Sequence, residues 1–138
     1  MLLTYQLRVD PDSRIIYQGK LVSMENTLEA FRRYVNFGCD GGRISTISLP
    51  GGIVLVVHGD SKLLGFPVNR ALVGEGDHII NILAGNIIAV RTDREKFASI
   101  QLSDVEFLER CLPPAFVNNE KIGVIRGKNL PEYQGEDF

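Results

Sequence analysis

The sequence predicts an α+β domain in which a mixed, mainly antiparallel sheet of about five strands carries two short helices packed on one face. Short apolar or alternating segments, separated by turn residues, indicate the strands. Two segments with apolar residues at helical spacing, each behind a capping-box pair, indicate the helices. A length of 138 residues, with 44% hydrophobic and 23% charged residues, is typical of one globular domain.

The N-terminal segment predicts a hairpin. Apolar and polar residues alternate over residues 3–9, as in a strand with one buried face. A turn cluster occupies residues 10–13, and residues 15–17 are expected to open the second strand.

The first helix is expected after Asn26. Asn26 and Glu29 have the capping-box spacing, in which the Asn side chain accepts from first-turn amides and the Glu side chain reaches back. Gly38 is expected to end the helix, because glycine tolerates the left-handed geometry of a helix C-terminus. The apolar positions at helical spacing are Leu28, Phe31 and Val35.

The second helix is expected after Ser103, which has the same spacing to Glu106. Two prolines at positions 113 and 114 are expected to end it. Its apolar stripe consists of Val105, Leu108, Cys111 and Leu112.

The middle of the chain predicts the clearest hairpin. Residues 43–49 are rich in β-branched side chains, and a turn at residues 50–52 separates them from residues 53–57. The second of these segments is continuously apolar, which indicates a central strand covered on both faces. Residues 79–83 fit either a strand or a short helix, and residues 87–90 predict another strand.

The chain is predicted to divide near residue 114. Residues 1–114 would form a single α+β domain, and residues 115–138 a C-terminal extension that ends in a mobile acidic tail. Within the extension, residues 122–125 could add a short strand to the sheet edge.

Composition and charge exclude several classes of protein. The net charge of −2 disfavours a dedicated nucleic-acid binder, because phosphate binding usually shows as a basic excess. No apolar run approaches the ~20 residues that a membrane span needs. The N-terminal residues lack the basic and apolar regions of a signal peptide. We therefore expect a cytoplasmic protein without a membrane partner, in which Cys39 and Cys111 are reduced thiols.

Residues 57–77 are the segment most indicative of function. This stretch follows the continuously apolar strand and mixes glycines, a proline, apolar residues and isolated charges. Long connections in small domains tend to be functional or disordered, and this one carries too many apolar residues to be disordered.

The same segment carries a resemblance to a known family. After Gly59 and Asp60, the residues from Lys62 to Arg70, followed by an apolar segment and Gly85, resemble a family of small bacteriophage and mobile-element proteins that is catalogued as a domain of unknown function. The similarity covers roughly residues 1–112. It implies a phage accessory protein acting in the cytoplasm of the bacterial host, and it implies no catalytic residues.

Four residues of this segment are the candidate ligand-binding set: Lys62, Phe66, Asn69 and Arg70. Arginine presents a planar fork of donors suited to phosphate or carboxylate, and asparagine offers a donor and an acceptor. A neighbouring aromatic ring could supply a stacking face. The set predicts a pocket for a nucleotide-like or acidic ligand.

A structural interpretation of the same residues stays open. Arg70 could instead pair with Asp60, Glu75 or Asp77, and Asn69 could cap a turn.

No complete catalytic or metal-binding motif is present in the sequence. The glycines at positions 74 and 76 lack the lysine and serine of a phosphate-binding loop. His58, Asp60 and Asp77 could in principle serve a small hydrolase, but these groups show no recognised ligand or nucleophile spacing. We expect no metal and no cofactor.

The leading hypothesis is therefore a non-enzymatic phage accessory binding protein. It would engage a host protein or sequester a small acidic, nucleotide-like ligand, and sequestration of a nucleotide immune signal would make it a counter-defence protein. The alternative is the small hydrolase. Exposed sheet edges and a small core further lead us to expect a homo-oligomer.

Overall fold

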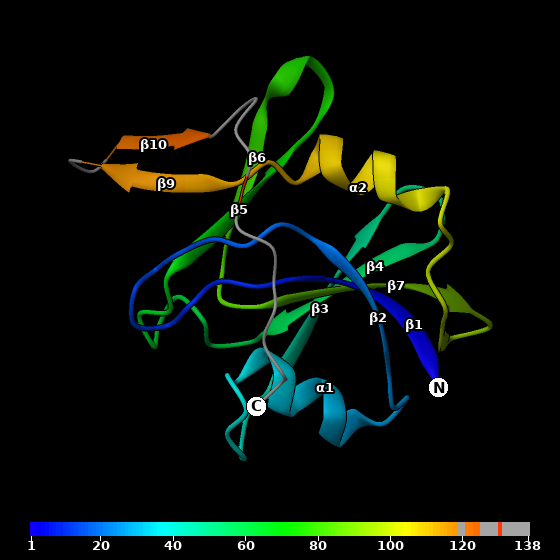
Figure 1. Cartoon of the computed structure of the whole chain (residues 1–138). Helices are drawn as coiled ribbons and strands as arrows, with labels where there is room; N and C mark the ends of the chain where they lie inside the picture. The colour runs from blue at the N-terminus through cyan, green and yellow to red at the C-terminus, as the bar shows by residue number, and fades with distance from the viewer. Residues whose placement is uncertain (119–120, 125–129, 131–138) are drawn as a thin grey trace.

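The centre of the fold is a sheet in which β2, β1, β7, β4 and β3 lie side by side and β8 pairs with β7 (Figure 1). The computed structural model describes residues 1–118, 121–124 and 130, and within them this sheet has six strands. Every pairing in it is antiparallel. Its strands are β1 (Leu2–Leu7), β2 (Lys20–Met24), β3 (Ile44–Leu49), β4 (Ile53–His58), β7 (Ile87–Asp93) and β8 (Lys96–Ala98). The predicted α+β class with a mainly antiparallel sheet is confirmed.

Both predicted hairpins form, and the N-terminal one differs in where its second strand begins. The pairing of β3 with β4 is the hairpin expected at residues 43–57. At the N-terminus, the regular partner of β1 is β2, which begins only at Lys20. Residues 15–17 come before it and pair with residues 8–10 through a bridge between Ile16 and Val9 and two backbone hydrogen bonds. Arg14 has a left-handed φ of 63°, which interrupts an extended strand directly after the turn.

Both faces of the sheet are buried. Successive side chains of a strand point to opposite faces, so β4 contributes Ile53 and Leu55 to one apolar cluster and Val54 and Val56 to another. The prediction from the continuous apolar run is therefore confirmed: β4 is a central strand covered on both faces.

The helices lie on opposite faces, and this corrects the expectation that they share one. Helix α1 (Leu28–Val35) packs Phe31 and Val35 against the face that carries Val54, whereas α2 (Asp104–Cys111) packs Leu108 against the face that carries Leu55. Figure 1 shows the two helices on either side of the sheet. Helical periodicity reveals an apolar stripe but does not reveal which sheet face that stripe covers.

The N-cap of α1 lies one residue later than the sequence predicted. Thr27 rather than Asn26 is the N-cap, since its hydroxyl accepts the Ala30 N–H at 3.1 Å. Gly38 ends the helical segment as expected, with a φ of 82° and its N–H bonded to the Arg33 carbonyl.

The start of α2 is held by a carboxylate. Ser103 makes no side-chain capping bond. Instead, Asp104 accepts the Gln101 N–H at 2.8 Å and two hydrogen bonds from Arg91 on β7, at 2.6 and 2.7 Å. These bonds tie the first turn of α2 to the central sheet.

The loop after β4 is shorter than the segment of residues 57–77 that the sequence indicated. It becomes strand β5 (Val68–Val73), which continues through the short 3-10 turn η1 (Glu75–Asp77) into strand β6 (Ile79–Ala84). Residues 79–83 are thus strand rather than helix. The β5–β6 hairpin forms its own two-stranded sheet, and Leu72 and Leu83 bury it in the same cluster as α2.

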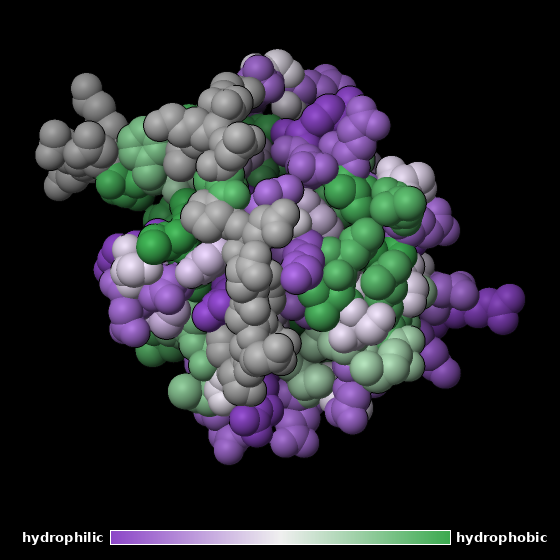
Figure 2. Space-filling view, viewed as in Figure 1, coloured by the Kyte–Doolittle hydropathy of each residue, from purple (hydrophilic) through white to green (hydrophobic). Residues whose placement is uncertain are grey.

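A further hairpin follows residue 114. Strands β9 (Ala115–Asn118) and β10 (Lys121–Val124) pair with each other. The sequence suggested that residues 122–125 could add a strand to the edge of the main sheet, but among the described residues β10 pairs with β9 instead. Ala115 is buried against Ala71, while Phe116, Val117 and Ile122 are exposed, and Figure 2 shows apolar side chains gathered on this hairpin. The predicted acidic tail lies outside the described residues.

No helix in the part of the chain that the structure describes is long and apolar enough to cross a membrane.

Candidate functional site

The β4–β5 connection is an ordered turn rather than an open loop. The Leu64 N–H bonds to the Asp60 carbonyl at 2.9 Å, and the Phe66 N–H bonds to the Ser61 carbonyl at the same distance. Gly65 takes a left-handed φ of 71° at the tightest point of the turn. Of the four predicted ligand-binding residues, Lys62 and Phe66 lie on this turn and Asn69 and Arg70 lie on β5.

Asn69 is a buried structural link. Its side chain is 0% exposed, and its amide nitrogen donates to the carbonyl oxygens of Leu7 at 2.9 Å and of Gly85 at 2.8 Å. These two acceptors belong to the end of β1 and to the turn between β6 and β7. Asn69 therefore holds the β5–β6 hairpin against the main sheet.

Arg70 is buried as well, with 2% of its surface exposed. Its guanidinium donates to the Asn69 side-chain oxygen, to the Asn69 carbonyl at 3.4 Å and to the Tyr17 carbonyl at 2.7 Å. Its partners are thus backbone and amide oxygens rather than the carboxylates of Asp60, Glu75 or Asp77. Burial lowers the pKa of Arg70 to about 10, against the opposing effect of Tyr5. This geometry supports the structural interpretation of both residues that the sequence left open.

Phe66 lies between two rings at the base of the turn. It makes edge contacts with Phe37 at 4.9 Å and with His58 at 5.1 Å between ring centroids. Gly85 approaches it so closely that an added Cβ would lie 2.9 Å from the Phe66 ring. Phe66 thus anchors the turn on the sheet.

Lys62 borders a hollow of about 400 Å³ between the turn and β6. Its ammonium donates to the Asn81 side-chain oxygen at 3.0 Å, and the same oxygen accepts the Ile82 N–H at 2.8 Å. The polar residues that line the hollow are Ser45, His58, Asp60, Ser61, Lys62 and Asn81. Asn81 was not among the predicted site residues, because it lies in a largely apolar run that fitted either a strand or a short helix and carried no signal of a site.

The electrostatics of this hollow leave Lys62 as its principal charge. Asp60 is paired with Arg43 at 3.2 Å. Burial lowers the pKa of His58 from 6.5; Asp60 opposes this effect, and Arg43 adds to it. His58 Nδ1 accepts the Asp60 N–H at 2.9 Å, so in the neutral ring the proton is on Nε2. The lining thus holds the Lys62 cation and neutral donors, together with the Asp60 carboxylate that is paired with Arg43, and an anion would bind on the Lys62 side.

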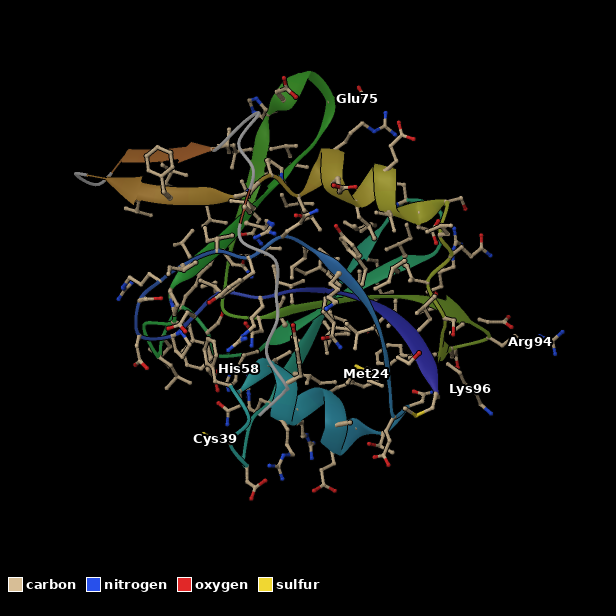
Figure 3. The ribbon with its side chains drawn as sticks, viewed as in Figure 1. Met24, Cys39, His58, Glu75, Arg94 and Lys96 are labelled. Carbon is tan, nitrogen blue, oxygen red and sulfur yellow. The ribbon has the colours of Figure 1, made fainter. Side chains whose placement is uncertain are left out.

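The hydrolase residues do not form one group. Asp77 belongs to the turn at the tip of the β5–β6 hairpin, beside Glu75, and Figure 3 shows Glu75 at the top of the molecule and His58 well below it, near α1. The Asp60 carboxylate faces Arg43 rather than His58, whose Nδ1 is occupied by a backbone N–H. Among the described residues, no group of three His, Cys, Asp or Glu side chains could hold a metal ion.

A second hollow, of about 420 Å³, lies between α1 and β2 and includes Gln6 in its lining. Gln6 is 3% exposed, and within the described residues its side-chain oxygen has no hydrogen-bond partner. An unsatisfied buried polar group costs roughly 1–3 kcal/mol. The alternating pattern of β1 assigned Gln6 to a polar face, and no sequence signal showed that α1 would cover that face.

Comparison with known proteins places the chain in a family but gives it no function. No curated protein and no solved structure matches it. A family model described as "Domain of unknown function (DUF3846)" matches residues 6–112. The match spans most of the chain and includes the turn with Lys62, β5, β6 and both helices, so the protein belongs to this family of unknown function.

Proposed function

We propose that this protein is a non-enzymatic binding protein that holds a small acidic ligand in the hollow beside the β4–β5 turn. The observation that carries the proposal is the Lys62 ammonium, which borders the hollow and is positioned by Asn81 at 3.0 Å. An ammonium has three N–H donors, and Asn81 takes one of them. The remaining donors suit a phosphate or carboxylate group.

The rest of the lining supports an anion with an uncharged part. Ser45 and Ser61 supply hydroxyl donors, and Ile47 and Leu83 supply apolar surface. A volume of about 400 Å³ is within the usual range of small-molecule sites. A nucleotide combines these properties, since it carries phosphate charge on a flat, largely apolar base.

Titration calorimetry with 3′,5′-cyclic AMP, ADP-ribose and uncharged adenosine tests the proposal. We expect the two anions to bind and adenosine to bind at least about ten-fold more weakly. Lys62→Gln should weaken anion binding by about ten-fold, because a charged hydrogen bond contributes roughly 1.5–3 kcal/mol. Lys96→Gln is the matched control, an exposed lysine on β8 that lies away from His58 in Figure 3.

The same titrations can contradict the proposal. Heats that stay flat for every anion, or equal affinity in the Lys62 and Lys96 variants, would remove the site. Incubation of each bound anion with the protein, followed by chromatography, separates binding from hydrolysis. A product that disappears in His58→Ala would favour the hydrolase instead.

The proposed biological role is supported only by the resemblance of the sequence to phage and mobile-element proteins. The protein would be a bacteriophage or mobile-element accessory factor in the host cytoplasm, and sequestration of a nucleotide signal there would counter a host defence. Expression of the protein in bacteria that carry a nucleotide-signalling defence tests this role. Rescue of phage growth by the native protein, and not by Lys62→Gln, is the expected result.

A protein partner is a second candidate, favoured by two exposed leucines on the same turn. Leu63 is 86% exposed and Leu64 is 56% exposed. Adjacent apolar side chains at a turn tip are suited to insertion into a partner's groove. In the defence assay, Leu63→Ser with Leu64→Ser would abolish rescue while leaving nucleotide affinity unchanged if a host protein is the target.

Self-association is the remaining part of the proposal. The outer strands β2 and β3 of the described sheet offer backbone groups for pairing with another copy. Native mass spectrometry reports the subunit number directly, and a purely monomeric spectrum would contradict a homo-oligomer.

A further inference from the structure

The hollow between α1 and β2 is separate from the Lys62 site. Its floor includes Gln6 of β1 and Tyr34 of α1, and its wall on the sheet side includes Val22 and Met24. Figure 3 shows Met24 beside α1. The site lies on the α1 face of the sheet, whereas Lys62 borders β6, which packs with α2 on the other face.

The orientation of the Gln6 side chain is fixed by its neighbours. The Thr4 hydroxyl donates its single proton to the Val22 carbonyl at 2.7 Å, so towards Gln6 it can only accept. The Gln6 nitrogen must therefore face Thr4, to which it donates at 3.2 Å, and it also contacts the Met24 sulfur at 3.6 Å. With the amide flipped, the Gln6 oxygen would face two other acceptors, the Thr4 hydroxyl and the Met24 sulfur. The buried atom without a partner is therefore the oxygen Oε1, which is a hydrogen-bond acceptor.

The charges around this hollow complement that acceptor. Glu25 and Glu29 are exposed and belong to its lining. The one lining arginine, Arg33, donates to Asp40 at 3.3 Å and to the Gly38 carbonyl at 3.2 Å. Two carboxylates and a buried carbonyl oxygen remain for an incoming group, and all of them accept hydrogen bonds.

We propose that this hollow binds a small organic cation that carries N–H donors, such as an alkyl guanidinium or a primary amine. One N–H donates to Gln6 Oε1, the positive charge lies near Glu25 and Glu29, and the alkyl chain contacts Val22 and Met24. Oε1 is closed to water, so a lining side chain must move before the ligand reaches it. Met24 lines the hollow with its sulfur 3.6 Å from Gln6 Nε2, and we include movement of this flexible side chain in the proposal. The inference does not depend on the proposed function, because the site and the ligand charge both differ.

Titration calorimetry with agmatine, and with butyltrimethylammonium as a cation that lacks N–H donors, tests the proposal. We expect agmatine to bind and butyltrimethylammonium to bind at least about ten-fold more weakly, because only the former can satisfy Oε1. In methyl NMR spectra, agmatine should shift the Met24 signal. Equal affinity for the two cations, or no binding of agmatine at millimolar concentration, would overturn the proposal.

Two variants locate the site. Gln6→Met keeps the side-chain length and removes the acceptor, so agmatine affinity should fall by about ten-fold. Glu29→Gln, on the surface of α1, should reduce it several-fold. Glu106→Gln is the matched control, since Glu106 is likewise an exposed glutamate in the first turn of an eight-residue helix.

These variants also keep the two proposals distinguishable. If Gln6→Met fails to fold, Glu29→Gln and the Met24 signal still decide the question. Lys62→Gln should leave agmatine affinity unchanged. Loss of agmatine binding in Glu106→Gln or Lys62→Gln, with no loss in Glu29→Gln, would place the cation elsewhere and contradict the inference.

Discussion

Asn69 and Arg70 are neighbours in sequence whose side chains hydrogen-bond to each other inside the protein. Adjacent residues of a regular strand point to opposite faces and cannot meet in this way. The pairing of β5 with β6 shifts register between Val68 and Arg70, and such a bulge re-aims the side chains around it. The bulge thus lets one asparagine hold both a neighbouring arginine and two distant carbonyl groups.

Asn69→Ala should destabilise the fold strongly. The substitution removes the donor to Leu7 and Gly85 and the acceptor for a buried guanidinium. Because buried polar groups that lose a partner cost roughly 1–3 kcal/mol each, we expect the free energy of unfolding to fall by about 2–4 kcal/mol. Urea denaturation followed by circular dichroism measures the change. Asn26→Ala, at an exposed position, is the control, and an equal loss in both variants would contradict the structural role.

Gly85→Ala should destabilise the fold both by straining a left-handed backbone and by placing a Cβ against Phe66. A comparison with Gly51→Ala separates these two effects. Gly85 and Gly51 have nearly equal φ angles of 80° and 82°. An added Cβ at Gly51 would meet no atom within 4 Å, whereas at Gly85 it would lie 2.9 Å from Phe66. Gly51→Ala should therefore cost roughly 1–2 kcal/mol for its backbone alone. Thermal unfolding should show a larger loss for Gly85→Ala; equal losses would mean that the contact with Phe66 carries no energy.

The Arg91–Asp104 pair should make the stability of the fold depend on acid pH. Hydrogen bonds from Arg91 hold the pKa of Asp104 below 3.8. A carboxylate with a lowered folded-state pKa stabilises the protein above the unfolded-state value, and this contribution is lost as the pH falls through the folded-state value. At pH 6, Asp104→Asn should reduce the free energy of unfolding by roughly 1.5–3 kcal/mol, which is typical of hydrogen bonds to charged groups.

Urea midpoints measured from pH 6 down to pH 2 check this dependence. The difference between the native protein and Asp104→Asn should shrink as the pH falls below 3.8. Asp93→Asn, at an exposed position of β7, should show a small difference at every pH. A difference for Asp104→Asn that stays constant with pH would mean that its charge does not stabilise α2.

The two cysteines should differ in reactivity. Cys39 is exposed, while burial raises the pKa of Cys111 to about 11. Because the thiolate is the reactive form, iodoacetamide at pH 8 should modify Cys39 first. Intact mass spectrometry of a time course, with Cys39→Ser as the reference, measures both rates. In urea the two should react alike, and equal rates in the folded protein would contradict the burial of Cys111.

The local pattern of the sequence was sufficient for much of the fold. Alternation in β1, the turn before Ile53 and the spacing of Phe31 and Val35 each depend on contacts within a few residues. The hairpin of β3 and β4 and the two helices were therefore predictable. The N-terminal hairpin was also predictable, but its regular second strand begins at Lys20 rather than at residue 15, because residues 15–17 pair with residues 8–10 only through a single bridge and two backbone hydrogen bonds.

The candidate site was only partly predictable. Lys62 borders a hollow and stays a predicted binding residue, whereas Asn69 and Arg70 were expected in a loop and lie buried on β5. Polar residues favour loops on average, and a buried asparagine or arginine is explained only by the distant carbonyl groups that accept its hydrogen bonds. These acceptors, on Leu7, Tyr17 and Gly85, are far from β5 in sequence.

By itself, the sequence determined the α+β class, the central strand buried on both faces and the hairpin of β3 and β4. The tertiary structure decided that α1 and α2 cover opposite faces, that Gln6 is buried beneath α1 and that Arg70 is enclosed by backbone carbonyls. The physical reason is the range of the interactions. Periodicity reports which side chains share a face, but the element that covers each face is selected by packing between segments distant in the chain.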